Sequence, residues 1–326
     1  MQRPSGRLKE QQSVHAAVEW HQGINSPAVS RRLGRMVRDW WLVVLPFAFY
    51  AAFFIVPVLL IALQSFATYN GEGHGANPVA GALTFDNYLN VFTPTFRLVF
   101  AASVQNALLG TALCIAIGYP VAYFISTRCP DRLKPWLLVL VVVPFWTSYL
   151  LRMLGWRILL GGNGIVSQAL QAVGLLRTGE SLLFTQTAVQ LGLVYNFLPM
   201  MILPIYVSID RLSKDQREAS RDLYARPWQT FLGITLPLTA PGIMAGAMIV
   251  FITMTSDYVT PELMGGAKGM MIGTLIYSQF LQGENWPLAS AMALSLVIVV
   301  VASVVVMAGA AAAVQRLPAL ARRLTR

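Results

Sequence analysis

The chain alternates between long apolar stretches and shorter polar connections. Six apolar stretches stand out, namely Trp41–Leu63, Leu98–Ile125, Pro135–Leu151, Gln186–Ile209, Ala240–Val259 and Leu288–Ala313. An α-helix rises about 1.5 Å per residue, so a stretch of roughly 20 residues crosses the hydrocarbon core of a bilayer. The pattern therefore predicts six transmembrane helices. A further short amphipathic helix is expected at Ile165–Leu176, on the outer side.

Composition supports the same conclusion. Of the 326 residues, 56% are hydrophobic and only 12% are charged, and the mean hydropathy is +0.59. Soluble globular domains carry about 25% charged residues. We therefore expect an all-α membrane protein, embedded in the lipid bilayer and without a soluble catalytic domain.

The basic residues are distributed unevenly between the two ends of the predicted helices. Of the 24 Lys and Arg residues, 19 fall on one set of alternate connections, which comprises residues 1–38, 128–134, 211–226 and 316–326. Cytoplasmic connections of membrane proteins carry an excess of Lys and Arg. We therefore expect this set, including both termini, to be cytoplasmic. Orientation in the membrane accounts for the net charge of +10, and no nucleic-acid partner is implied.

The sequence shows no pattern for a metal or a nucleotide. Cys114 and Cys129 lack the spacing of metal ligands, and the three His residues are scattered over a tail and a loop. A Gly-x-x-x-x-Gly-Lys-Ser/Thr phosphate loop is absent. A membrane enzyme would need a nucleophile with a base, or a metal cluster, and the apolar stretches show neither. We expect no catalytic residue, no metal and no cofactor in this chain.

The most informative polar connection lies between the fourth and the fifth predicted helix, and we call residues 213–226 the docking segment. Ser213-Lys214-Asp215-Gln216 has the spacing of a capping box, which predicts the start of a helix. Glu218 and Asp222 are four residues apart and share one face of that helix. Alone, the pattern would also fit a solvated surface helix. Its place between two apolar stretches favours a face presented to a partner protein.

The docking segment resembles the EAA loop of the inner-membrane permease subunits of binding-protein-dependent ABC importers. The resemblance rests on Glu218-Ala219-Ser220 and, at matching offsets, on Ile234, Leu236 and Pro237. It implies a type I ABC importer permease fold, with a cytoplasmic coupling helix that sits in a cleft of the ATPase subunit. The residues implied to couple to the ATPase are Glu218, Ala219, Ser220, Asp222, Tyr224, Ala225 and Arg226.

Tyr224 departs from the family pattern, which usually has Gly at this position. If the turn needs a left-handed backbone, a Tyr there costs roughly 1–2 kcal/mol. We expect the turn to be kept, with Tyr224 either at negative φ or under tolerated strain. We also expect its ring to add a contact to the ATPase.

A second resemblance narrows the family to its spermidine/putrescine branch, over roughly residues 41–310. Its most specific part is the block 257–273, which includes Asp257-Tyr258-Val259-Thr260-Pro261-Glu262, and it extends to residues 144–149, 225–227 and 285–287. The resemblance implies polyamine uptake by alternating access. Permeases of this type often leave most recognition to the binding protein, so an opine, another amine or a metal chelate remains an alternative substrate.

A small set of residues in and beside the apolar stretches are candidates for the substrate path. A di- or polyammonium ion that loses water needs carboxylates and aromatic faces, and an ionisable residue inside the membrane is a functional candidate. The alternatives are a structural Asp near a helix end, and aromatic residues that form an interfacial belt. The candidates are Asp257, Tyr258, Trp146, Tyr149, Tyr195, Asn196 and Glu262, of which Glu262 also fits the interface.

These expectations divide the chain into a cytoplasmic basic tail (1–39), a first helix with its periplasmic loop (40–97), a permease core with five helices (98–315) and a second cytoplasmic tail (316–326). The implied location is the cell inner membrane. The implied partners are an ATP-binding cassette ATPase dimer that binds ATP-Mg, a second permease subunit and a periplasmic substrate-binding protein. A channel is the alternative from another class, but it would need no charged docking segment.

Overall fold

A computed structural model describes residues 44–69, 71, 83–212, 224 and 226–324, with side chains described as far as residue 309. These residues form helices and connections, and no strand occurs among them. Two units are distinguished, residues 1–61 and 62–326. In the first unit, the described residues belong to the helix Val44–Gln64, which contains a π-helical turn, η1 (Ala51–Ile55), and continues as α3 (Val56–Gln64).

The predicted all-α membrane class is confirmed. Five helices in the described residues are long and apolar enough to cross a membrane, and they lie at Val44–Gln64, Pro94–Thr127, Gln186–Asp210, Pro227–Ser256 and Trp286–Gly309. A bent pair, Lys134–Trp146 with Tyr149–Ala172, gives the sixth span when it is counted as one.

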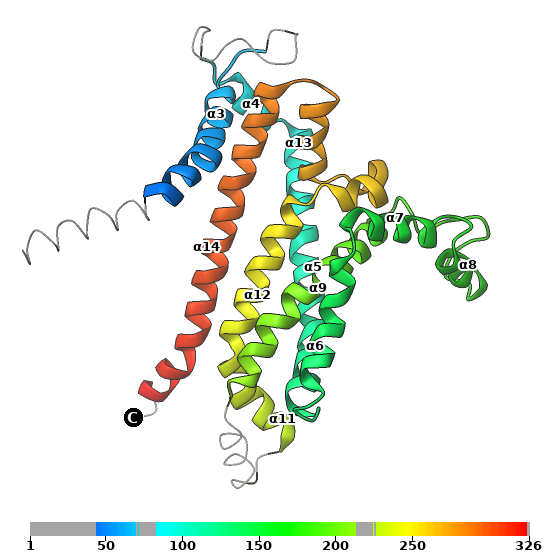
Figure 1. The fold of residues 1–326 in the computed structure, drawn as a ribbon, viewed down its shortest axis with the longest axis vertical. Coiled ribbons are helices and arrows are strands. Elements are labelled where there is room, and N and C mark those ends of the chain that lie inside the picture. The colour runs from blue at the N-terminus through cyan, green and yellow to red at the C-terminus, as the bar shows by residue number, and fades with distance from the viewer. Residues whose placement is uncertain (1–43, 70, 72–82, 213–223, 225, 325–326) are drawn as a thin grey trace, which may run out of the picture. The chain divides into compact units, whose positions relative to one another are not determined.

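Three helices form the core of the second unit, namely α5 (Pro94–Thr127), α9 (Gln186–Asp210) and α12 (Leu236–Ser256), and Figure 1 shows them side by side. Their shared core includes Leu193, Met201 and Phe251. Lipid does not drive apolar helices together as water does, so close packing between small residues matters more here. A Cβ on Gly242 would lie 2.6 Å from the carbonyl oxygen of Pro204 on α9, and this glycine therefore allows close contact.

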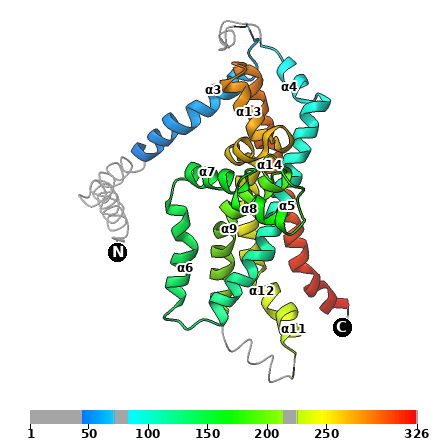
Figure 2. The ribbon, with the colours of Figure 1, turned by 90° about the vertical axis from the view of Figure 1, so that its right-hand side faces the viewer.

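The third predicted helix, Pro135–Leu151, is broken, which corrects the prediction of one straight span. It consists of α6 (Lys134–Val142) and a 3-10 turn, η2 (Val143–Trp146), followed after two residues by α7 (Tyr149–Leu160). The two parts meet at 86°, and Figure 2 shows α7 running across the end of α6. Thr147 and Ser148 are extended, with ψ of 154° and 133°, and so they end the helix.

The fifth span also differs from the prediction of Ala240–Val259. It begins at Pro227 with α11 (Pro227–Thr230), passes through a π-helical turn, η3 (Phe231–Thr235), and continues as α12 to Ser256. In the π turn the Leu236 N–H bonds to the carbonyl of Phe231. Prolines are tolerated in spanning helices where local adjustments of this kind satisfy the backbone. Asp257 consequently lies just past the helix end.

The remaining elements complete the second unit. They are α4 (Asp86–Val91), α8 (Ile165–Ala172), η4 (Pro261–Gly265), η5 (Gly266–Gly269), α13 (Ile272–Leu281) and α14 (Trp286–Leu324). The α14 helix packs against α4, α12 and α13. Two predictions are refined, because α8 is shorter than Ile165–Leu176 and the last helix extends beyond Leu288–Ala313. The helix α13 was not predicted.

Candidate functional site

The two helix breaks meet at a hydrogen-bonded cluster. Tyr149 is the first residue of α7, and Asp257 directly follows α12. The Tyr149 hydroxyl donates to Asp257 Oδ2 at 2.6 Å, and the Thr260 hydroxyl donates to the same oxygen at 2.6 Å. Asp257 Oδ1 accepts the backbone N–H of Val259 at 3.0 Å. The carboxylate thus joins α7 to the end of α12, and two residues that the sequence suggested separately lie in direct contact.

The cluster extends to α9 through a sulfur atom. The Asn196 amide donates to Met153 Sδ at 3.3 Å, and the Thr260 hydroxyl contacts the same sulfur at 3.7 Å. Asn196 is buried, and its Oδ1 has no hydrogen-bond partner among the described residues. A buried amide oxygen that lacks a donor is costly in a low-dielectric interior. It is therefore a ready acceptor for water or for a donor group that enters the bundle.

Arg152 holds the bend beside this cluster. Its guanidinium lies 4.4 Å from the ring centroid of Phe145 and 5.9 Å from that of Tyr149. Its Nη1 also donates to the carbonyl of Pro144 at 3.1 Å. These contacts connect the first turn of α7 to η2 and so stabilise the angle between α6 and α7.

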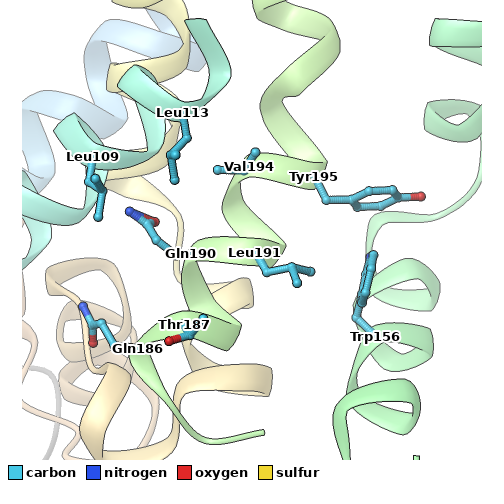
Figure 3. A pocket seen from close by; sticks show the side chains of 9 residues that line it. All are labelled: Leu109, Leu113, Trp156, Gln186, Thr187, Gln190, Leu191, Val194 and Tyr195. Carbon is cyan, nitrogen blue, oxygen red and sulfur yellow. The ribbon is translucent and has the colours of Figure 1, made fainter. Parts of the chain in front are cut away.

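A pocket of about 590 Å³ opens between α5, α7 and α9. Figure 3 shows Trp156 and Tyr195 facing each other across one side, and their rings form an edge-to-face pair with centroids 5.3 Å apart. The lining is mainly apolar, with polar side chains from one face of α9; its residues are Leu109, Leu113, Trp156, Gln186, Thr187, Gln190, Leu191, Val194 and Tyr195. Methylene groups and aromatic faces are the groups that an alkylammonium chain contacts favourably.

Three path candidates lie outside both the Asp257 cluster and the pocket. Tyr258 stacks on Tyr277 of α13, with ring centroids 4.8 Å apart. Trp146 is 79% exposed at the end of η2, and Glu262 is exposed in η4. In the isolated chain these two side chains fit an interfacial position as well as a path.

Most of the docking segment, residues 213–223 and 225, lies outside the described residues, so the predicted residues Glu218, Ala219, Ser220, Asp222 and Ala225 have no structural account here. Tyr224 has φ of +55° and is 96% exposed. This outcome matches the strained alternative of the prediction, and the ring is free to meet a partner. Arg226 precedes α11, and its backbone N–H donates to Gln229 Oε1 at 2.8 Å.

Several residues that the structure places in the site were not predicted from the sequence. Met153 and Trp156 lie on α7, beyond the end of the predicted third helix at Leu151, and Thr260 lies within the block 257–273 without having been singled out. Gln190 was not among the residues predicted for the path. Its four-residue spacing from Gln186 on α9, which places both on the face that lines the pocket, is the signal that would have identified it.

The chain matches the family described as binding-protein-dependent transport system inner membrane component over residues 114–318. It is 39% identical over 252 residues to the spermidine/putrescine transport system permease protein PotB of Haemophilus influenzae, which covers 77% of this chain and 86% of that protein. It is 30% identical over 264 residues to the inner membrane ABC transporter permease protein YdcU of Escherichia coli K12, with 78% and 83% covered.

Solved structures give a likeness at low sequence identity. A chain of a bacterial ABC transporter involved in the import of the acidic polysaccharide alginate superimposes with a TM-score of 0.65 at 19% identity, and the match covers 86% of this chain and 98% of that one. At this identity the likeness shows a shared fold.

Proposed function

Because the chain belongs to the family of binding-protein-dependent transport system inner membrane components, we propose that it is the translocating subunit of an ABC importer for polyamines such as spermidine and putrescine. Its fold is that of a type I importer permease, as predicted, and it is a multi-pass protein of the inner membrane. The observation that carries the substrate class is the 39% identity to a spermidine/putrescine permease over 77% of the chain.

In this proposal the energy comes from a separate subunit. The permease binds no nucleotide, and ATP-Mg is held by an ATPase dimer that docks on residues Glu218, Ala219, Ser220, Asp222, Tyr224, Ala225 and Arg226. A second permease subunit completes the translocation path, and a periplasmic binding protein delivers the substrate. The solved alginate transporter, one structure of which is in complex with a periplasmic protein, supports this type of assembly. Both termini are placed in the cytoplasm because 19 of the 24 Lys and Arg residues fall on their side.

The substrate path is proposed to pass the Asp257 cluster. Its carboxylate accepts two hydroxyl hydrogen bonds, which hold it in place and leave its negative charge available to an ammonium group. Tyr149 and Tyr195 add aromatic faces, and Asn196 adds a buried amide oxygen that has no hydrogen-bond partner in the part of the chain that the structure describes. The proposed path residues remain Asp257, Tyr258, Trp146, Tyr149, Tyr195, Asn196 and Glu262.

The proposed mechanism is alternating access. ATP binding closes the ATPase dimer and moves the docking segment, and the permease bundle then opens to the periplasm to accept substrate from the binding protein. ATP hydrolysis reverses the movement and releases the substrate into the cell. A ligand-driven change of this kind requires two bundle conformations with different affinities for substrate.

The test is uptake of labelled putrescine and spermidine into proteoliposomes that contain the co-purified complex, with ATP inside and binding protein outside. ATP-dependent accumulation of either polyamine is the expected result. A labelled opine, a labelled unrelated amine and a labelled metal chelate are offered in parallel. Accumulation of one of these, with no polyamine entry, would overturn the substrate class, and failure of any ATPase subunit to co-purify would overturn the permease assignment.

A further inference from the structure

A cluster of charged side chains joins three helices at the end of the bundle where the docking segment begins. Asp210 is the last residue of α9, three residues before position 213, and Lys134 is the first residue of α6. Lys134 Nζ lies 3.4 Å from Asp210 Oδ1, and the Ser126 hydroxyl of α5 donates to the same oxygen at 3.5 Å. Lys134 Nζ also lies 2.8 Å from Oδ1 of Asp131, in the turn between α5 and α6.

The two ion pairs of Lys134 differ in what they connect. The pair with Asp131 is local, three residues apart, and Asp131 is 81% exposed. The pair with Asp210 links α6 to α9 across 76 residues of sequence. The Lys134 side chain is only 16% exposed, so its methylene stem is packed against neighbouring residues, whereas the hydrogen bond from its ammonium to Asp210 is exposed. Asp210 is 45% exposed, so this pair is expected to weaken as the salt concentration rises.

We propose that Lys134 and Asp210 are positioning residues that transmit movement of the docking segment to α6. The proposal rests on the proposed function, in which residues 213–226 contact the ATPase. A displacement of this segment acts first on the end of α9, and the ion pair passes it to the start of α6. The other end of α6 leads into the 86° bend, after which Tyr149 bonds to Asp257.

The geometry explains why a polar link is suited to this place. The ion pair between α6 and α9 joins the first residue of one helix to the last residue of the other. An ion pair at such a joint holds the two ends at a fixed distance while permitting rotation about the contact. Apolar packing between the same ends would resist rotation, because interdigitated side chains have few alternative arrangements.

A charge exchange tests the proposal in the reconstituted complex. Because Asp131 would repel a glutamate at position 134, the exchange is made in an Asp131→Asn background, which is also the matched control. In this background we compare Lys134→Glu, Asp210→Lys and the double variant. Two ratios are measured. The first is the amount of substrate taken up per ATP hydrolysed, and the second is the ATPase rate with binding protein divided by the rate without it.

Each single exchange is expected to lower both ratios about fivefold, the factor that corresponds to an ion pair worth about 1 kcal/mol. The double variant is expected to recover to within about twofold of the control, and Asp131→Asn alone is expected to match the wild type. Unchanged ratios in the single variants, or no recovery in an assembled double variant, would overturn the proposal. If a single exchange prevents assembly, Lys134→Met and Asp210→Asn replace it, with the same fivefold loss expected.

The two readouts separate this proposal from the function on which it rests. A wild-type complex whose ATPase responds to binding protein while no polyamine enters would refute only the substrate class. The ATPase ratio would still test the Lys134–Asp210 link, because it does not depend on which substrate crosses the membrane.

Discussion

Asp257 accepts the backbone N–H groups of Val259 at 3.0 Å and Thr260 at 3.5 Å, which is the arrangement of a helix cap. It also accepts the hydroxyl of Tyr149. The sequence left two interpretations open, a structural Asp and a path-lining carboxylate, and the hydrogen bonds are compatible with both. Substitution by Asn separates them, because Asn is an equally good cap through its one oxygen but carries no charge. Its amide nitrogen replaces Oδ2 and donates, so the Tyr149 and Thr260 hydroxyls would have to accept instead of donate.

We expect Asp257→Asn to lower polyamine uptake about tenfold, which corresponds to a loss of about 1.4 kcal/mol in binding the cation along the path. The amount of assembled complex should not change, since the cap is kept. Uptake into proteoliposomes and size-exclusion chromatography of the complex measure the two quantities. Tyr149→Phe is the control, because it removes the hydroxyl that bonds to Asp257 and Thr260 and leaves the carboxylate. Normal uptake by Asp257→Asn would assign the residue to the helix cap alone.

Tyr224 has a left-handed backbone and an almost fully exposed ring. Replacement by Gly should therefore have two opposite effects, a relief of backbone strain and a loss of the contact that the ring would make. Tyr224→Gly relieves about 1 kcal/mol of backbone strain but removes the ring. If the ring contacts the ATPase, the affinity between permease and ATPase should fall about tenfold for Tyr224→Gly and stay unchanged for Tyr224→Phe. Binding of purified ATPase to permease in nanodiscs measures this. Equal or tighter binding by the Gly variant would refute the contact.

At the level of elements, the packing of α9 against α12 depends on Gly242. Gly242→Ala would place a methyl group 2.6 Å from the Pro204 carbonyl oxygen and against Ser208, so the helices must move apart. We expect a loss of about 1–3 kcal/mol in the free energy of unfolding. Size-exclusion chromatography of heated samples measures it, because the variant should lose its single elution peak at a lower temperature. Gly233→Ala is the matched control, since no atom lies within 4 Å of its new Cβ. Equal heat resistance of the two variants would contradict the packing argument.

The spans were predictable from the sequence because apolar length alone defines them, but the helix breaks were not. The fifth span was predicted to begin at Ala240, yet the helix starts at Pro227 and continues through a π turn and past Pro237 and Pro241. Conversely, the break at Thr147 and Ser148 has no strong local signal, because Pro144 alone fits either a kink or a helix start. Both outcomes depend on how neighbouring helices provide hydrogen-bond partners for the freed backbone N–H and C=O groups.

The site shows the same division between local and tertiary information. Tyr149 and Asp257 were each selected from their residue type and depth, and their 2.6 Å contact is a property of the folded bundle. Met153 carried no signal of its own, because a methionine in an apolar helix is usually a core residue. Its place between Asn196 and Thr260 becomes visible only when α7 and α9 are packed together.

At the scale of the whole molecule, transport requires that the docking segment connect this chain to its ATPase. Glu218→Lys reverses a charge on the face predicted to meet that subunit, so like charges or an unpaired charge would be buried in the contact. We expect uptake to fall at least about tenfold, with normal insertion into the membrane and reduced co-purification of the ATPase. Glu10→Lys, the same change on the same predicted side of the membrane, should leave all three quantities unaltered. Wild-type uptake by Glu218→Lys would refute the docking assignment. Added positive charge favours a cytoplasmic location, so a loss of insertion in both variants would instead contradict the predicted topology.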